Sequence, residues 1–205
     1  MRTHSASAEP APRTMPADFD PWLSGATAAD VAAASFADAE GLARRRASRL
    51  AELIESAARD SAFYRRRWAG VRTAHARLED LPVVHKGELM RHFDRWVTDP
   101  ALRLHELRRF VADPACVAQP YLGRYIVWQS SGSGGEPGLF VQDARSLAVY
   151  DALEALRRPA VPPWRLLDPF FMTERIAFVG AIGGHFASTV TVLRLLRINP
   201  VFRWT

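Results

Sequence analysis

The sequence predicts an α/β fold in which a helical N-terminal region precedes a partial open α/β sheet. Residues 38–60 have the apolar spacing of an amphipathic helix. Two short apolar segments, 124–128 and 139–141, flank a run of small residues and are expected to be strands. A third apolar segment, 175–181, precedes a glycine turn and a helical pattern. Strands and helices that alternate in this order are typical of an open sheet.

Composition bounds the fold without deciding the function. The chain of 205 residues is long enough for one domain with a substantial core. It carries 27 Lys+Arg against 22 Asp+Glu, a net charge of +5, and Lys86 is its only lysine. This balance favours anionic ligands in general. The single cysteine, Cys116, excludes an intramolecular disulfide and is consistent with a cytoplasmic location.

The N-terminal residues 1–35 are rich in Ala, Pro, Ser and Thr and show no sustained apolar period. We therefore expect a mostly disordered tail with a short ordered piece near 19–22, and a domain over residues 36–205. Residues 1–17 lack the apolar core of a secretory signal. The uncharged stretch 176–193 is interrupted by glycines, which favours a strand, a turn and a helix over a membrane span.

The helices expected after the tail cover residues 38–60, 86–95 and 104–112. Asp143 is a suitable N-cap for a further helix, and the last helix covers about 186–197. The expected core-facing residues of the first and fourth of these helices are Leu42, Leu50, Leu53, Ile54 and Ala57, and Leu147, Tyr150, Leu153 and Leu156.

Two arginine triplets, 44–46 and 65–67, raise the question of nucleic-acid binding. Successive helical residues point about 100° apart, so each triplet would spread around its helix. The sequence also lacks a zinc-finger pattern, an RNA-binding aromatic signature and a heptad zipper. We expect solvated helix faces and no nucleic-acid partner.

The candidate functional residues lie in the small-residue run: Ser130, Ser131, Gly132, Ser133, Gly134 and Gly135. Glycines let backbone N–H groups converge on one point, and serine hydroxyls add donors, so the run could hold a phosphate. The same residues are common in ordinary tight turns, and that interpretation stays open. The glycine spacing and Pro137 exclude a Walker loop and a dinucleotide fingerprint.

The run 130–137 resembles the phosphate-loop motif of adenylate-forming (AMP-binding) enzymes, Ser/Thr-Ser-Gly-Ser/Thr-Thr-Gly-x-Pro. Residues 63–71 are similar to the early Phe-Tyr-Arg segment of the phenylacetate–CoA ligase-like branch, and residues 78–86 to its Leu-Glu-Asp-Leu-Pro segment. Residues 183–187 are similar to a later Gly-Gly-His-aromatic segment of that branch. The similar segments occur in the family's order over roughly residues 40–205.

The resemblance implies the front part of the large N-terminal domain of such an enzyme. It implies ATP-dependent activation of a small carboxylic acid through an acyl-adenylate, with Mg²⁺ and with coenzyme A as an acceptor. Residues 130–135 would bind the ATP phosphates, and His185 would lie on the acyl-substrate side. Lys86 does not match the family's catalytic lysine, so we expect it at the surface.

The sequence departs from the family pattern in two ways. Gly134 stands where the motif has threonine, and Gly138 where many relatives have lysine. The family's later segments, which supply its adenine-side, ribose and catalytic-lysine contacts, do not occur in the 205 residues. We therefore expect a truncated, inactive portion, which a complementary C-terminal fragment or self-association would complete. The alternative is a non-catalytic nucleotide-binding or protein-interaction remnant; catalytic residues cannot be assigned, and no metal ligands or membrane partner are expected.

Overall fold

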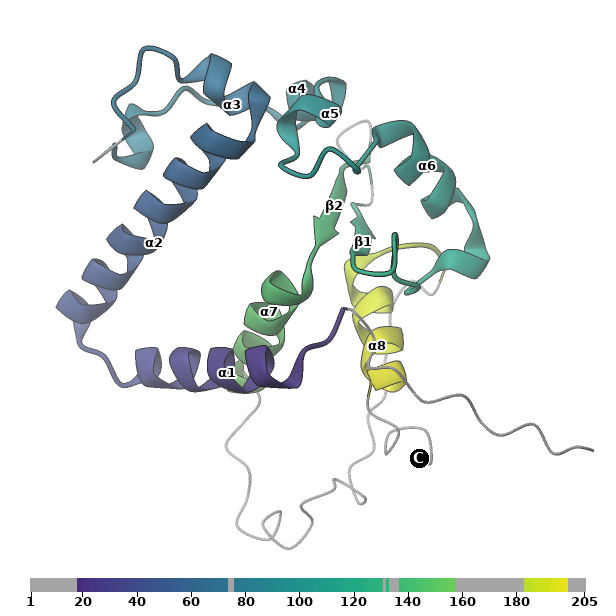
Figure 1. Ribbon diagram of the computed structural model, residues 1–205. Helices are drawn as coiled ribbons and strands as arrows, with labels where there is room; N and C mark the ends of the chain where they lie inside the picture. Colours follow the sequence, from purple (N-terminus) through teal and green to yellow (C-terminus); the bar gives the residue numbers. More distant parts are fainter. Residues whose placement is uncertain (1–17, 74–75, 131, 133–136, 158–182, 199–205) are drawn as a thin grey trace, which may run out of the picture.

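The computed structural model describes residues 18–73, 76–130, 132, 137–157 and 183–198. It is rich in helices and contains one small antiparallel sheet of two strands (Figure 1). The fold class is therefore mixed α and β, as expected. The predicted strands at 175–181 and 201–202 lie outside the described residues.

The two strands form a central hairpin, β1 (Ile126–Gln129) and β2 (Leu139–Gln142). Ile126 is paired with Gln142 and Gln129 with Leu139. Since side chains alternate along a strand, the two faces of the hairpin carry different residues. Val127 and Leu139 contribute to one hydrophobic cluster, and Ile126 to another.

Short helices cover the Val127 face. They are α4 (Lys86–Arg91), α5 (Phe93–Trp96) and α6 (Leu104–Ala112), and their buried residues include Met90, Phe93 and Leu107. The sequence predicts one helix over 86–95, but the structure divides it at His92 into α4 and α5. The predicted helix over 104–112 is confirmed.

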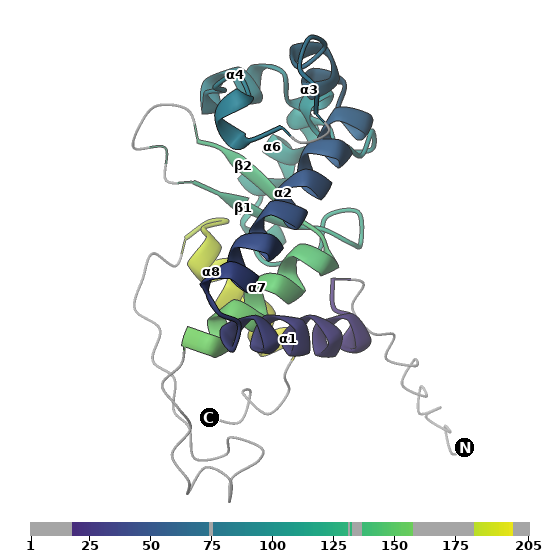
Figure 2. The same ribbon diagram turned by 90° about the vertical axis from the view of Figure 1, so that its left-hand side faces the viewer.

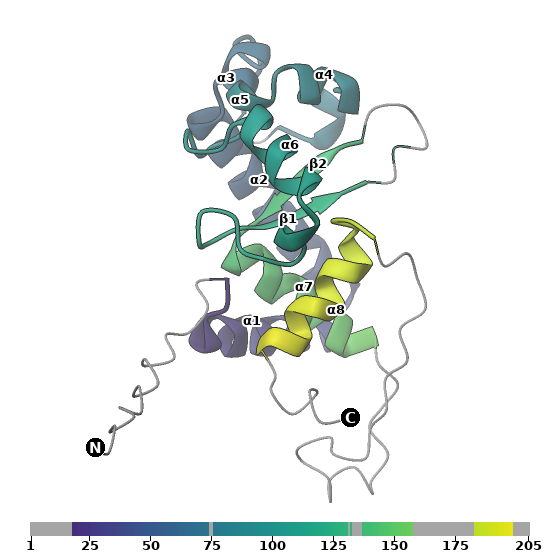
Figure 3. The same cartoon turned by 90° about the vertical axis from the view of Figure 1, so that its right-hand side faces the viewer.

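Helices α7 (Ala144–Arg157) and α8 (Ala187–Ile198) lie next to β1, on the side away from α4 and α6 (Figure 3). Leu147 of α7 and Val190 of α8 pack with Ile126 in the second cluster. The predicted cap is confirmed, because the Ser146 N–H donates to Asp143 Oδ1 at 2.8 Å. The helix predicted over about 186–197 is confirmed by α8.

The predicted core-facing side of α7 is correct at Leu147 and wrong at Leu153 and Leu156. Leu147, Ala148 and Ala152 are buried, whereas Leu153 and Leu156 are 45% and 49% exposed. A spacing of three residues falls 60° short of a full turn at each step, so Leu156 lies half a turn from Leu147. Residues spaced regularly by three therefore do not lie on one face of the helix, and the later members of the predicted set point away from the core.

A helix, α1 (Pro21–Ser35), occupies most of the described part of the segment expected to be a disordered tail. The carboxylate of Asp20 accepts hydrogen bonds from the Trp22 and Leu23 N–H groups, and Pro21 begins the helix. Alanine has the highest helix propensity, so the Ala-rich composition suits a helix that lacks a strong apolar face. Helix α1 packs against α7 at the base of the molecule (Figure 2).

The long helix α2 (Ala39–Asp60) joins α1 to the short helix α3 (Ala62–Arg67). Its position agrees with the predicted range 38–60, and its predicted core face is confirmed in part, since Leu50 and Ala57 are half-buried. Ile54 is 2% exposed, whereas Leu42 and Leu53 are 45% and 66% exposed. Two short 3₁₀ turns, Leu78–Asp80 and Pro114–Cys116, complete the described elements. Across the described ranges, no helix is both long and apolar enough to cross a membrane.

A buried ionic network joins the N-terminal segment to α7 and α8. The side chain of Arg194 is 2% exposed and binds both carboxylate oxygens of Asp151, at 3.0 and 2.9 Å. Its Nε also lies 3.5 Å from Asp18, whose side chain is fully buried and forms a second ion pair with Arg197. Buried charges need such partners because burial removes their hydration.

We predict that Arg194→Met lowers the free energy of unfolding by about 3–5 kcal/mol, because it leaves the carboxylates of a buried network short of a partner. Urea denaturation followed by circular dichroism measures the change. Arg46→Met is the matched control, since Arg46 is exposed on α2 and should tolerate the same substitution. Equal stability of the two variants would contradict this role of the network.

Candidate functional site

Two hydrogen bonds close the base of the small-residue loop. The Ser130 N–H donates to the Gly138 carbonyl at 2.9 Å, and the Gly138 N–H donates to Ser130 Oγ at 2.8 Å. The loop therefore leaves the hairpin with its two ends fixed next to one another. The Ser130 amide is used in this closure, but the Ser130 hydroxyl can still donate its own proton to a ligand.

The exit of the loop is tightly packed. A Cβ atom at Gly138 would lie 3.3 Å from Cδ of Lys86 and 3.2 Å from the Phe140 ring. Gly138 is therefore needed for the close approach of the Lys86 side chain from the start of α4. Gly132, at the other side of the loop, has φ of +72°, the left-handed conformation that glycine adopts most readily.

His185 lies beside β1 and not in open solvent. Its carbonyl accepts a hydrogen bond from the Gln129 N–H at 2.7 Å, and Phe186 forms a parallel bridge with Gln129. The imidazole is 1% exposed and lies 5.3 Å from the Phe110 ring. Burial lowers the pKa of His185, whereas the backbone of Val127 and Asp113 acts in the opposite direction. His185 is thus attached to the strand that enters the loop.

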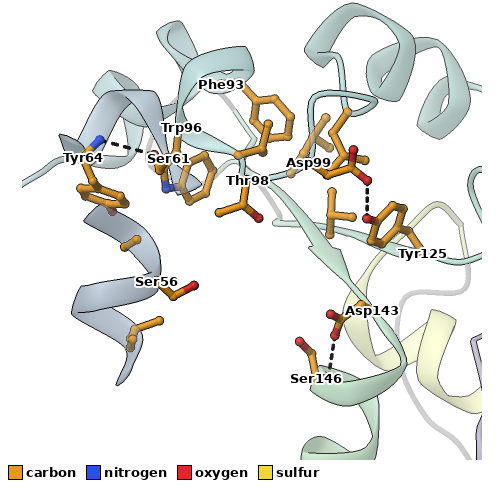
Figure 4. A pocket seen from close by; sticks show the side chains of 16 residues that line it. Ser56, Ser61, Tyr64, Phe93, Trp96, Thr98, Asp99, Tyr125, Asp143 and Ser146 are labelled. Atoms are coloured by element: carbon orange, nitrogen blue, oxygen red, sulfur yellow. Dashed lines mark hydrogen bonds between the residues drawn. The ribbon is translucent and has the colours of Figure 1, made fainter. Parts of the chain in front are cut away.

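A cavity with a volume of about 450 Å³ lies between α2, α5 and the hairpin (Figure 4). Tyr64, Phe93, Trp96 and Tyr125 contribute aromatic rings, and Leu53 and Val141 contribute apolar surface. Among the described residues, the charged groups of its lining are the carboxylates of Asp99 and Asp143. A cavity of this kind suits an apolar ligand better than a phosphate.

A polar cluster fixes one wall of this cavity. The Tyr125 hydroxyl donates to Asp99 Oδ2 at 2.6 Å, and Arg124 binds the same oxygen at 2.5 Å. The hydrogen bond from Tyr125 is the largest cause that lowers the pKa of Asp99, and the Ala101 N–H adds to it. Burial, followed by the hydrogen bond to Asp99, raises the pKa of Tyr125 to about 12.

The structure brings together some of the predicted site residues. Ser130 and Gly132 lie in the loop, and His185 lies beside the strand that enters it. Ser131, Ser133, Gly134 and Gly135 lie outside the described residues. His185 is absent from the lining of the cavity in Figure 4, so its substrate-side role stays a prediction. Within the described part of the chain, no group of three or more His, Cys, Asp or Glu side chains could hold a metal ion.

Comparisons of the chain with protein-family models, with curated proteins and with solved structures find no match. The resemblance to adenylate-forming enzymes is therefore a hypothesis carried by the sequence motifs.

Sequence analysis missed the position of Lys86. It is exposed, as expected, but its aliphatic chain lies against the loop exit, 52 residues later in the sequence. The signal that could have found it is Gly138, a small residue where many relatives of the resembled family have lysine.

We predict that Ser130→Ala lowers the free energy of unfolding by about 1 kcal/mol, because the Gly138 N–H loses its acceptor. Thermal or urea unfolding measures the loss. The control is Ser48→Ala, since the exposed Ser48 donates a hydrogen bond to Glu52 on its own helix. A Ser130→Ala protein as stable as the Ser48→Ala protein would contradict the closure of the loop by this hydroxyl.

We predict that Tyr125 ionises near pH 12 and not near its ordinary value of 10.0. Because the folded state raises this pKa, the stabilisation by the protonated hydroxyl is complete below pH 10.0 and is lost as the pH rises towards 12. An ultraviolet titration of tyrosinate in the folded protein measures the effect, and Tyr125→Phe should remove the last phase. If Tyr125→Phe removes an early phase instead, the assignment is wrong.

Proposed function

We propose that the loop 130–135 binds the phosphate groups of ATP in an enzyme that activates a small carboxylic acid as its acyl-adenylate. The observation that carries the proposal is the closed base of the loop at Ser130 and Gly138. A loop with fixed ends can present donors to an anion without first losing much conformational freedom. This geometry suits phosphate binding and is also compatible with a structural turn.

Charge near the loop supports a phosphate ligand. Lys86 rests on Gly138 through its aliphatic chain, and its ammonium group lies two bonds beyond the atom in contact. A positive charge close to the loop exit favours an anion bound in the loop. Sequence supplies three serine hydroxyls, at Ser130, Ser131 and Ser133. Hydroxyl donors and a cation together could stabilise charge on pyrophosphate as it leaves the α-phosphorus.

The cofactors follow from the chemistry of the proposed reaction. ATP would arrive with Mg²⁺, which neutralises its phosphate oxygens. The carboxylate oxygen would form a bond to the α-phosphorus as pyrophosphate leaves, and a thiol such as coenzyme A would then accept the acyl group. His185, whose carbonyl is hydrogen-bonded to the strand that enters the loop, would lie on the acyl side. The single cysteine is consistent with a cytoplasmic enzyme.

We predict that the chain binds Mg-ATP and that Ser131→Ala/Ser133→Ala weakens binding at least about tenfold, since hydrogen bonds to charged groups contribute that much. Isothermal titration calorimetry measures the affinity. The matched control is Ser48→Ala/Ser56→Ala, which removes two hydroxyls from α2. Absence of Mg-ATP binding, or equal binding by both double variants, would refute the proposed phosphate loop.

Catalysis needs a separate measurement. Carboxylate-dependent exchange between pyrophosphate and ATP detects the acyl-adenylate directly. Exchange with any of a panel of aryl and aliphatic acids would support the enzyme. Binding of Mg-ATP without exchange, by this chain and by a mixture with a complementary fragment, would favour the alternative of a non-catalytic nucleotide-binding protein.

A further inference from the structure

The second of the two arginine triplets, 65–67, forms part of a basic pocket that the proposed ATP loop does not include. The pocket has a volume of about 330 Å³ and lies between α3 and α5. Its lining consists of Ala62, Phe63, Arg66, Arg67, His92 and Arg95. Three guanidinium groups and an imidazole therefore surround one hollow, and none of the described residues that line it carries a carboxylate.

The nearest acidic side chains already have partners. Glu88 binds Arg67 at 2.6 Å, and Asp94 pairs with Arg103 at 3.6 Å and accepts a hydrogen bond from the Leu104 N–H. Among the described residues, no carboxylate pairs with Arg66 or Arg95. Both are exposed and carry uncompensated positive charge at the same hollow. Like charges held close together repel, and a bound anion removes this cost.

The pocket also has a rigid aromatic wall. The rings of Phe63 and His92 lie 5.8 Å apart with an interplanar angle of 33°. Arg67 is fixed by Glu88 and by the Val83 carbonyl, and its guanidinium lies 5.8 Å from the centre of the Phe63 ring. Its Nε–H is buried and has no acceptor among the described residues. One cation is thus held in place while Arg66 and Arg95 are free to close on a ligand.

We propose that this pocket binds a small phosphate ester that carries a flat ring. Arginine donates two parallel hydrogen bonds to a phosphate, which a pair of guanidinium groups can grip from two sides. The Phe63 and His92 wall would contact the ring. The volume is that of one small ligand and not of an extended strand, so a small molecule is favoured over RNA.

The test uses phenyl phosphate as the probe, titrated into the full chain by calorimetry without Mg²⁺ or ATP. Arg66→Gln/Arg95→Gln should weaken binding at least about tenfold, because it removes two charge-assisted contacts. Arg44→Gln/Arg46→Gln makes the same change of charge on the exposed part of α2 and should bind as the unmodified chain does. Equal affinity of the two double variants would overturn the proposal.

Further arms separate the neighbouring interpretations. Phe63→Leu should reduce the affinity for phenyl phosphate towards that for inorganic phosphate, and no reduction would remove the ring from the proposal. Ser131→Ala/Ser133→Ala should leave the affinity for phenyl phosphate unchanged. Failure of the proposed ATP loop can therefore be distinguished from failure of the proposed phosphate-ester pocket. Single-stranded polyuridylate that binds through Arg66 and Arg95 more tightly than phenyl phosphate would overturn the small ligand in favour of RNA.

Discussion

The alternation of side chains along β1 is the constraint on which the described structure depends. Val127 faces α4, α5 and α6, and Ile126 faces α7 and α8, so adjacent residues enter different hydrophobic clusters. A shift of register by one residue would exchange the two clusters and expose both. The same strand leads into the small-residue loop and pairs with His185. The packing that fixes the hairpin therefore also fixes the base of the candidate site.

The sequence predicted the local elements best where a strong periodic or capping signal was present. Helix α6, the strands around the loop and the Asp143 cap all follow from such signals. The prediction was wrong for α1, because it gave more weight to a composition typical of disorder than to the helix propensity of alanine and the N-cap at Asp20. The predicted face of α2 is correct only in part, because Ile54 is buried whereas Leu42 and Leu53 are exposed. Contacts between residues far apart in the sequence determine which side chains are buried, and the contact between Lys86 and Gly138 is of the same long-range kind.

Charge is distributed unevenly over the described surface. In the cavity shown in Figure 4, Asp99 and Asp143 are the charged residues among the described part of the lining. In the pocket between α3 and α5, the ionisable groups of the described lining residues are those of arginine and histidine. Phe93 lies at the boundary, since it lines the first hollow while its neighbour His92 lines the second. One short helical turn thus separates an acidic, aromatic cavity from a basic one, which gives the two hollows different ligand preferences.

The two classes of arginine in this chain illustrate why composition alone leaves function open. Arg194 pairs with Asp151 and Arg197 pairs with Asp18. The positive charge of both arginines is therefore neutralised by ion pairs that join distant segments. Arg66 and Arg95 face a hollow without carboxylates. All four count equally towards the net charge of +5. Only the uncompensated pair can contribute substantially to binding an anion, because a buried ion pair has already exchanged its hydration for its partner. The distribution of carboxylates, and not the number of arginines, therefore determines where an anion can bind.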